Sequence, residues 1–234
     1  MTAESRPARP TPVVAMSDVH KTFGTGPAAV HALAGVALTA APGELVALVG
    51  RSGSGKTTLL NIMGGLERPD AGTVHVAGKD LNALDDEGLN ALRRDSVAFV
   101  FQSFGLIDEL SAAENVGLPL RLKGWEPAQR DSRVATLLDL VGLGSHADHR
   151  PTEMSGGQMQ RVAIARALAS SPRLLIADEP TGQLDTETGL AVMALIRAVV
   201  EAEGMTAVLS THDPVMMALA DRAVHIRDGH LVEG

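Results

Sequence analysis

The apolar positions in the first half of the chain are spaced as in strands. Residues 45–49, LVALV, form a short unbroken apolar run that is typical of a strand buried on both faces. A glycine-rich turn and the helical run TLLNIM follow this strand. The same reasoning predicts four further strands and one helix, the strands at residues 13–19, 30–39, 73–76 and 97–101 and the helix at 84–94.

The region from residue 111 to about residue 141 is helical throughout by its pattern. Val134, Leu137, Leu138 and Val141 follow the i, i+3, i+4, i+7 spacing that places apolar side chains along one face of a helix. We therefore predict that this region is a helical insertion.

Strands and helices alternate again after residue 155. The pattern predicts helices at 155–170, at 186–203 and from 214 onwards, and strands at 174–177, 206–210 and 223–226. Asp228 and Gly229 then predict a tight hairpin turn. Because strands alternate with helices, we expect an α/β fold with a largely parallel sheet that is covered by helices on both faces.

The chain length of 234 residues predicts one domain, or one domain with a sizeable insertion. We assign residues 13–234 to this domain and place the helical insertion at about residues 103–152. Residues 1–12 are rich in proline and lack the apolar core of a signal peptide. They are therefore predicted to form a disordered lead-in.

Composition narrows the range of functions. The chain has no cysteine, which excludes disulfides, thiolate zinc sites and a cysteine nucleophile, and which favours a cytosolic location. Its formal charge of −8 gives it no general attraction for nucleic acid or anionic lipid. The longest uncharged stretch, residues 22–43, contains four glycines and two prolines and is not predicted to cross a membrane. Only Trp125 and four phenylalanines are aromatic, so few side chains could stack on a flat ligand.

A phosphate-binding motif follows the strand at residues 45–49. The pattern G-x-x-x-x-G-K-T stands between this strand and a helix, which is the context that a P-loop requires. Its glycines let backbone N–H groups point at phosphate oxygens, and the helix N-terminus adds the positive end of its dipole. Lys56 would neutralise the β- and γ-phosphates, and the Thr57 hydroxyl would bind Mg²⁺. The predicted nucleotide-binding residues are Gly50, Arg51, Ser52, Gly53, Ser54, Gly55, Lys56, Thr57 and Thr58.

The apolar strand at residues 174–177 ends in two adjacent acids, Asp178 and Glu179. Open α/β sheets bind ligands in the crevice at the carboxyl ends of their strands, so these two side chains would meet the nucleotide there. Asp178 suits a magnesium ligand, and Glu179 suits the base that activates a water. Alone the pair is a weak signal, because an acid after a strand can also cap a helix. Together with Lys56 it indicates nucleotide hydrolysis.

A second glycine motif begins the helix predicted at residue 155. Ser155 suits a helix cap, and the two glycines after it make another N-terminus that could bind phosphate, although one ATP needs only one such site. The segment MSGGQMQR resembles the signature LSGGQ-x-Q-R of the ATP-binding-cassette (ABC) family, with Met154 in place of leucine. In that family the signature binds the γ-phosphate of a nucleotide held by the opposite subunit. The resemblance therefore implies nucleotide contacts for Ser155, Gly156, Gly157 and Gln158.

The resemblance covers nearly the whole chain from about residue 13 and implies four further site residues. Gln102 resembles the glutamine that touches the metal and the attacking water, and His212 resembles the histidine that contacts the γ-phosphate and orients Glu179. Asp185 ends the segment TGQLD, which resembles the loop at the dimer contact, with Gln183 where asparagine is more familiar. Phe23 stands where the family keeps an aromatic ring that stacks on adenine, although a phenylalanine at a strand end can also belong to the core. The implied catalytic set is Lys56, Gln102, Glu179 and His212, and the implied metal set is Thr57, Gln102 and Asp178.

The resemblance also implies a fold, an activity and partners. The fold would be that of a P-loop nucleotide-binding domain of the ABC type, with an N-terminal antiparallel β subdomain and a helical insertion. The activity would be hydrolysis of ATP with Mg²⁺, driven by the closure of two cassettes on ATP. The stretches FVFQSFGLIDEL and ADEPTGQLD are similar to those of lipoprotein-releasing, macrolide-exporter and antimicrobial-peptide-resistance ATPases. That group pairs with membrane permeases, which implies a peripheral place at the cytoplasmic face of the membrane and a groove in the helical insertion for a short permease helix.

Three other functions stay open at this point. A related ATPase could regulate a cell-wall enzyme through a membrane partner and transport nothing. A soluble translation or repair ATPase fits less well, because the first type usually has two cassettes in one chain and the second needs a long coiled coil. A nucleotide-binding module without turnover fits poorly with the presence of Lys56, Asp178, Glu179 and His212 together.

Overall fold

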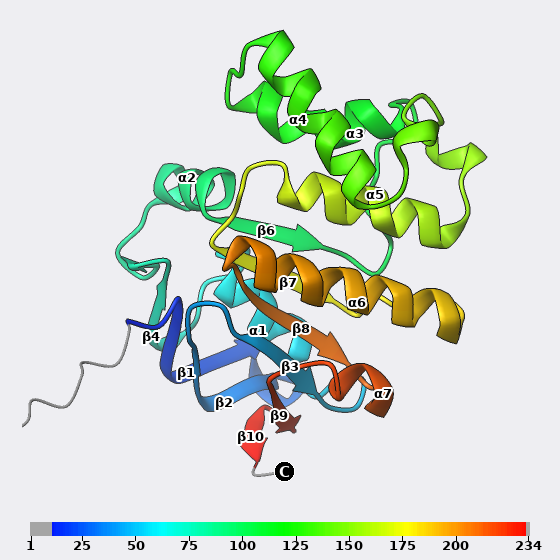
Figure 1. The fold of residues 1–234 in the computed structure, drawn as a ribbon. Coiled ribbons are helices and arrows are strands. Elements are labelled where there is room, and N and C mark those ends of the chain that lie inside the picture. The colour runs from blue at the N-terminus through cyan, green and yellow to red at the C-terminus, as the bar shows by residue number, and fades with distance from the viewer. Residues whose placement is uncertain (1–10, 233–234) are drawn as a thin grey trace, which may run out of the picture.

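Strands fill the lower part of the molecule and helices form its upper part (Figure 1). The computed structural model describes residues 11–232. The first ten residues of the predicted lead-in and the last two of the predicted domain therefore lie outside the described residues. Within the described part, no helix is both long enough and apolar enough to span a membrane.

The N-terminal part of the chain builds an antiparallel sheet with the strand order β2-β1-β4-β5. Its strands are β1 (Val14–Phe23), β2 (Val30–Ala40), β4 (Ala71–Val76) and β5 (Lys79–Asp80). β1 continues four residues beyond the predicted strand at 13–19, because register shifts let it stay paired with β2 as far as Phe23. The short β5 was not predicted, since two residues carry no periodicity.

The second sheet has the order β10-β9-β3-β8-β7-β6. Five of its strands are parallel, and β10 pairs antiparallel with β9 after the turn at Asp228 and Gly229. The largely parallel sheet and the hairpin were both predicted. The strands are β3 (Leu45–Val49), β6 (Val97–Val100), β7 (Leu174–Asp178), β8 (Thr206–Thr211), β9 (Arg222–Arg227) and β10 (His230–Val232).

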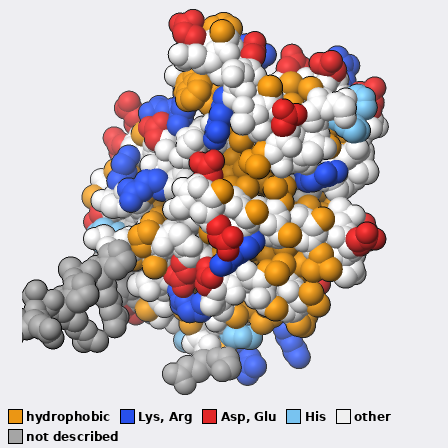
Figure 2. Space-filling view, viewed as in Figure 1, with side chains coloured by type: hydrophobic (Ala, Val, Ile, Leu, Met, Phe, Trp, Pro, Cys, Tyr) orange, Lys and Arg blue, Asp and Glu red, His pale blue; other side chains and the backbone are white. Residues whose placement is uncertain are grey.

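Helices and the antiparallel sheet cover the two faces of the parallel sheet. Leu45 and Ala47 of β3 belong to one hydrophobic cluster together with α5 and α6, whereas Val46 and Leu48 belong to another together with α1 and the antiparallel sheet. Figure 2 shows hydrophobic side chains at the surface between charged ones on the side where α6 lies. The helices of this part are α1 (Lys56–Met63), α2 (Asp86–Asp95), α5 (Gly156–Leu168), α6 (Thr186–Glu203) and α7 (Pro214–Met217).

The upper part consists of α3 (Ala112–Leu122) and α4 (Pro127–Leu140), which pack on α5. The prediction of one helical stretch at 111–141 is wrong in that the chain turns between these two helices. Gly124 adopts a left-handed φ of +70°, and Pro127 starts the next helix, where its missing N–H costs nothing. The predicted apolar face is confirmed, because Val134, Leu137, Leu138 and Val141 are all buried.

Candidate functional site

The loop between β3 and α1 has the shape that its glycines permit. Gly55 precedes α1 with a left-handed φ of +106°, and a Cβ on it would lie 2.4 Å from the Ala32 carbonyl oxygen. A side chain on Gly50 would likewise come within 2.4 Å of the Ile226 carbonyl oxygen. The loop can therefore be built only with glycine at these two positions. No side chain caps α1, so its N-terminal N–H groups stay available to a ligand.

Lys56 is a buried cation, with only 6% of its surface exposed. Its Nζ donates to the carbonyl oxygens of Gly50 at 2.8 Å and Arg51 at 3.1 Å. The Glu179 Oε1 is the carboxylate oxygen that approaches Nζ, at 3.7 Å, which is beyond hydrogen-bond distance. The P-loop thus bends around an ammonium group whose charge is only weakly compensated.

Asp178 lies at the carboxyl end of β7 and is held by two hydroxyl groups. Thr57 Oγ1 donates to one of its carboxylate oxygens at 2.8 Å, and Ser210 Oγ donates to the other at 2.6 Å. Ser210 lies on the neighbouring strand β8, directly opposite Asp178 in the parallel register. A carboxylate fixed in this way beside a threonine hydroxyl offers hard oxygen ligands of the kind that Mg²⁺ binds.

Glu179 adopts a left-handed φ of +45°, which is uncommon for a residue other than glycine. Its backbone N–H donates to the Ser210 hydroxyl at 2.8 Å, which helps to hold this conformation. Its carboxylate lies between Lys56 and His212, with His212 Nδ1 at 3.7 Å from Oε2. A strained backbone that aims an acid at a cavity is typical of a functional site.

The structure brings most of the predicted site residues to one cavity of about 840 Å³. Of the predicted P-loop residues, only Ser54 does not line it, and its buried hydroxyl has no hydrogen-bond partner among the described residues. A second cavity, of about 880 Å³, opens on the other side of the loop and includes neither Lys56 nor Asp178. The predicted residues that line the first cavity are Phe23, Gly50, Arg51, Ser52, Gly53, Gly55, Lys56, Thr57, Thr58, Gln102, Asp178, Glu179 and His212.

Phe23 lines the same cavity as the P-loop and Asp178. It ends β1, and its residue surface is 42% exposed, so it is not a core residue. Val30 and Ala32 of β2 line the cavity beside it. Phe23 thus presents an exposed aromatic ring in the same cavity as the phosphate-binding loop.

The signature segment does not line this cavity. Ser155 Oγ accepts from the Gln158 N–H at 3.3 Å, and Gln158 Oε1 accepts from the Ser155 N–H at 2.8 Å, which makes a capping box at the start of α5. A Cβ on Gly157 would lie 2.4 Å from Thr188 Cγ2, so this glycine also allows α5 to pack on α6. Asp185 caps α6 by accepting from the Thr188 N–H at 3.0 Å, and this bond is the main cause that lowers its pKa.

The residues of the cavity fit a nucleoside triphosphate and a magnesium ion. Lys56 and the uncapped start of α1 supply positive charge and N–H donors where phosphates would lie. Thr57, Gln102 and Asp178 carry oxygen atoms and line the same cavity, and the Thr57 hydroxyl lies 2.8 Å from a carboxylate oxygen of Asp178.

Three residues near the site were not predicted. Ser210 holds Asp178 and Glu179, and its position as the polar end of a buried strand was a usable signal. Gln160 is fully buried and donates to the Pro180 carbonyl oxygen at 2.6 Å, just after Glu179. Arg166 on α5 donates to the carbonyl oxygens of Phe104 and Gly105 in the loop after Gln102, and burial lowers its pKa. No sequence pattern marks those carbonyls as its partners.

Comparisons with known proteins all point to one family. The profile of the family described as ABC transporter matches residues 33–182. The macrolide export ATP-binding/permease protein MacB of Azoarcus sp. (strain BH72) is 46% identical over 222 residues, which are 95% of this chain and 34% of that protein. The methionine import ATP-binding protein MetN of Brucella abortus (strain 2308) is 43% identical over 100% of this chain and 62% of that protein. The chain thus spans about a third of MacB and less than two thirds of MetN.

Solved structures are similar to this chain in both fold and sequence. The ATP-binding cassette MJ0796, in a dimeric post-hydrolysis state bound to ADP and Pi, superposes with a TM-score of 0.87 at 42% identity. The match covers 94% of this chain and 97% of that one. The α/β fold of an ABC cassette, with its antiparallel β part and its helical part, is therefore confirmed.

Proposed function

Because the chain belongs to the ABC transporter family, we propose that it is the ATP-binding and ATP-hydrolysing subunit that powers a membrane transporter. One observation carries the proposal. Lys56, Thr57, Gln102, Asp178, Glu179 and His212 come from separate segments of the chain and line a single cavity. A buried cation, a fixed carboxylate and a second acid at one end of a cavity are the groups that phosphoryl transfer to water requires.

Each of these residues has a distinct task in the proposed reaction. Lys56 and the N–H groups at the start of α1 would bind the phosphates and stabilise the charge that develops during transfer. Asp178, Thr57 and Gln102 would hold Mg²⁺, which supplies further positive charge to the phosphate oxygens when it is bound. Glu179 would orient the attacking water and accept its proton, and His212 would keep the Glu179 carboxylate in place.

The site is proposed to be completed by a second cassette. Ser155 and Gly157 lie outside the cavity that contains Lys56, so they do not line the site of their own chain. In a dimer they would meet the nucleotide of the partner. The dimeric state of the MJ0796 cassette supports the pairing of two cassettes. ATP would then favour the closed pair, and hydrolysis would release it.

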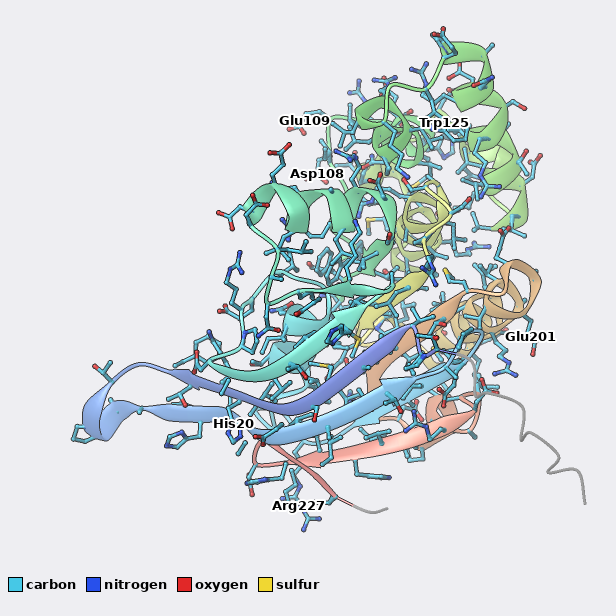
Figure 3. The ribbon with its side chains drawn as sticks, turned by 90° about the vertical axis from the view of Figure 1, so that its left-hand side faces the viewer. His20, Asp108, Glu109, Trp125, Glu201 and Arg227 are labelled. Atoms are coloured by element: carbon cyan, nitrogen blue, oxygen red, sulfur yellow. The ribbon has the colours of Figure 1, made fainter. Side chains whose placement is uncertain are left out.

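A groove between the two parts of the chain is proposed to receive the membrane partner. It has a volume of about 560 Å³ and an apolar wall that includes Phe101, Ile107 and Leu122. Asp108 and Glu109 extend at the surface next to Ile107 (Figure 3). Phe101, which lines the groove, directly precedes Gln102, which lines the nucleotide cavity, so a permease segment seated in the groove could sense the nucleotide. The domain limits 13–234 and the helical insertion at about 103–152 belong to this proposal, as does a place at the cytoplasmic face of the membrane.

Export, including extraction of lipoproteins, peptides or drugs, is the direction we propose. MacB and the pyoverdine export protein PvdT of Pseudomonas entomophila (strain L48) are both named for export, and both are 46% identical to this chain. Reconstitution of the chain with a membrane partner tests this directly. ATP-dependent movement of substrate out of the cytoplasmic side supports export, and uptake overturns it. ATP turnover that moves no substrate and instead controls a cell-envelope enzyme would favour the regulatory alternative.

The variant Glu179→Gln tests the catalytic assignment. We expect ATP to bind with unchanged affinity and turnover to disappear, because an amide cannot accept the proton of the water. ATP should then hold two chains together as a stable dimer, which is measured by gel filtration with light scattering. Glu203→Gln, at the exposed end of α6, is the matched control and should behave like the wild type. Turnover by Glu179→Gln at the wild-type rate would contradict the role of Glu179.

A further inference from the structure

The ring of Phe23 stands at the end of a projecting hairpin. Figure 3 shows β1 and β2 extending beyond the rest of the ribbon, with His20 labelled near the base of the projection. Phe23 is the last residue of β1, and a left-handed Gly24 follows it. At the end of a projecting hairpin, the position of a side chain is fixed only by its direct contacts with other residues. The contacts of Phe23 therefore decide where the ring lies relative to the phosphate-binding loop.

Lys21 is the cation that touches this ring. Its Nζ lies over the ring at 5.3 Å from the centre, within the range of a cation–π interaction. The two residues are close along β1, where the pairing with β2 is irregular between Lys21 and Thr22. Lys21 is absent from the lining of the 840 Å³ cavity, whereas Phe23 belongs to it. The ammonium thus contacts the ring without entering the space in which a base would stack.

Lys21 is itself held firmly by the segment that follows α1. Its Nζ lies 2.6 Å from Glu67 Oε1 and 3.4 Å from Asp70 Oδ1, and it donates to the Arg68 carbonyl oxygen at 2.8 Å. The side chain is only 11% exposed. The hydrogen bond with Glu67 is the main cause that raises the pKa of Lys21. Three oxygens match the three N–H donors of an ammonium group, so this cation has a fixed position.

Two further hydrogen bonds tie the same two segments together. The Thr22 N–H donates to Asp70 Oδ2 at 2.7 Å, and the Asp70 N–H donates to the His20 carbonyl oxygen at 2.9 Å. Because residues 67–70 follow α1, which begins with Lys56, the hairpin end is joined to the helix of the phosphate-binding loop. These backbone bonds would hold the strand in place even without Lys21. Beyond its own bonds to the same segment, Lys21 adds the contact with the ring, which these backbone bonds cannot supply.

We propose that Lys21 is a positioning residue for the nucleotide base, which holds the Phe23 ring by one face at a set distance from the P-loop and leaves the other face for adenine. This inference rests on the proposed function, in which Phe23 stacks on ATP. Lys21 acts through Phe23 and touches no part of the nucleotide. It therefore affects the binding of the base and not the binding of the phosphates.

The test compares two ligands that differ in the base. Affinities for ATP and for inorganic tripolyphosphate are measured by calorimetry without Mg²⁺, so that no hydrolysis occurs. Lys21→Met keeps most of the apolar stem and removes the charge, and it should weaken ATP binding about two- to fivefold, as expected for a cation–π contact at a partly exposed site. Tripolyphosphate binding should stay unchanged, and Lys21→Arg should restore ATP binding. Lys79→Met, which removes an exposed lysine from β5 of the same sheet, is the matched control.

A double variant separates this inference from the proposed function. If Lys21 acts through the ring, Lys21→Met should have no further effect on ATP binding in a Phe23→Ala background. Equal weakening of ATP and tripolyphosphate by Lys21→Met, or an equal effect with and without Phe23, would overturn the role of Lys21. If Phe23→Ala alone leaves the preference for ATP over tripolyphosphate unchanged, the stacking role of Phe23 fails. If Phe23→Ala weakens ATP binding but Lys21→Met does not, only the present inference fails.

Discussion

Two helices of this chain begin with glycine-containing motifs. They differ in whether a side chain caps the backbone N–H groups of their first turn. α1 begins after Gly55 with no side-chain cap, beside the buried Lys56 and inside the cavity. α5 begins after Ser155 with a complete capping box and lies outside that cavity. The N–H groups of α1 are thus left for a ligand of the same chain. At the start of α5, the N–H groups of Ser155 and Gln158 are already bonded within the capping box, so a ligand could use those two only in competition with the cap.

The glycines of the two motifs also serve different purposes. Gly50 and Gly55 are needed because the backbone approaches other segments closely within the loop. Gly157 is needed because α5 packs against Thr188 at the start of α6. Similar sequence motifs therefore begin one helix inside the cavity and one outside it. We propose that the first is the half of a site that a single chain forms and that the second serves the nucleotide of a partner. Variants in each helix can test this difference.

The largest expected effect is on the α1 side, in Lys56→Met. Removing a buried cation that binds phosphate should weaken ATP binding by about 2 to 5 kcal/mol, which is at least roughly thirtyfold. The measurement is ATP affinity by calorimetry, with thermal unfolding as a check on the fold. Lys79→Met serves as the control for the loss of one positive charge. A change of less than threefold in ATP affinity would contradict the view that α1 carries the preformed half of the site.

The α1 side was also the part that the sequence predicted best. The P-loop pattern is local, so its eight residues and the flanking strand and helix could be placed without knowledge of the rest of the chain. The burial of β3 on both faces followed from its unbroken apolar run, and the apolar face of α4 followed from its periodicity. The turn between α3 and α4 was missed, although Gly124 and Pro127 mark it in the sequence.

Contacts between distant segments could not be predicted. The hydrogen bond from Ser210 to Asp178 depends on the register of β7 and β8, which no local pattern fixes. The bond between Lys21 and Glu67 joins two segments whose pairing depends on the packing of the antiparallel sheet on α1. The left-handed φ of Glu179 likewise follows from its surroundings and not from its residue type.

The second prediction concerns the metal on the α1 side. Ser210→Ala removes the donor that fixes one oxygen of Asp178, and the loss of such a supporting hydrogen bond should weaken apparent Mg²⁺ affinity about tenfold. ATP binding without Mg²⁺ should stay unchanged, because Ser210 does not line the cavity. The measurement is ATP turnover as a function of Mg²⁺ concentration. Ser132→Ala on the exposed face of α4 is the control, and an unchanged Mg²⁺ dependence in Ser210→Ala would remove Ser210 from the metal site.

Ser155→Ala is expected to have the smallest effect on a single chain. It should also give the sharpest contrast between the two helices. It should destabilise the fold by about 1 kcal/mol through the lost cap and leave the ATP affinity of the single chain unchanged. Turnover should fall about tenfold or more, because a hydrogen bond to the partner's phosphate is lost.

Mixing Ser155→Ala with Lys56→Met then tests the division of the site. In a mixed dimer, Lys56 of one chain and Ser155 of the other make one intact site, while the opposite site lacks both groups. Random pairing of equal amounts should therefore restore roughly a quarter of the intact sites, although neither variant turns over well alone. Turnover that stays at the mean of the two separate variants would mean that α1 and α5 serve the same chain, and the comparison of the two helices would have to be abandoned.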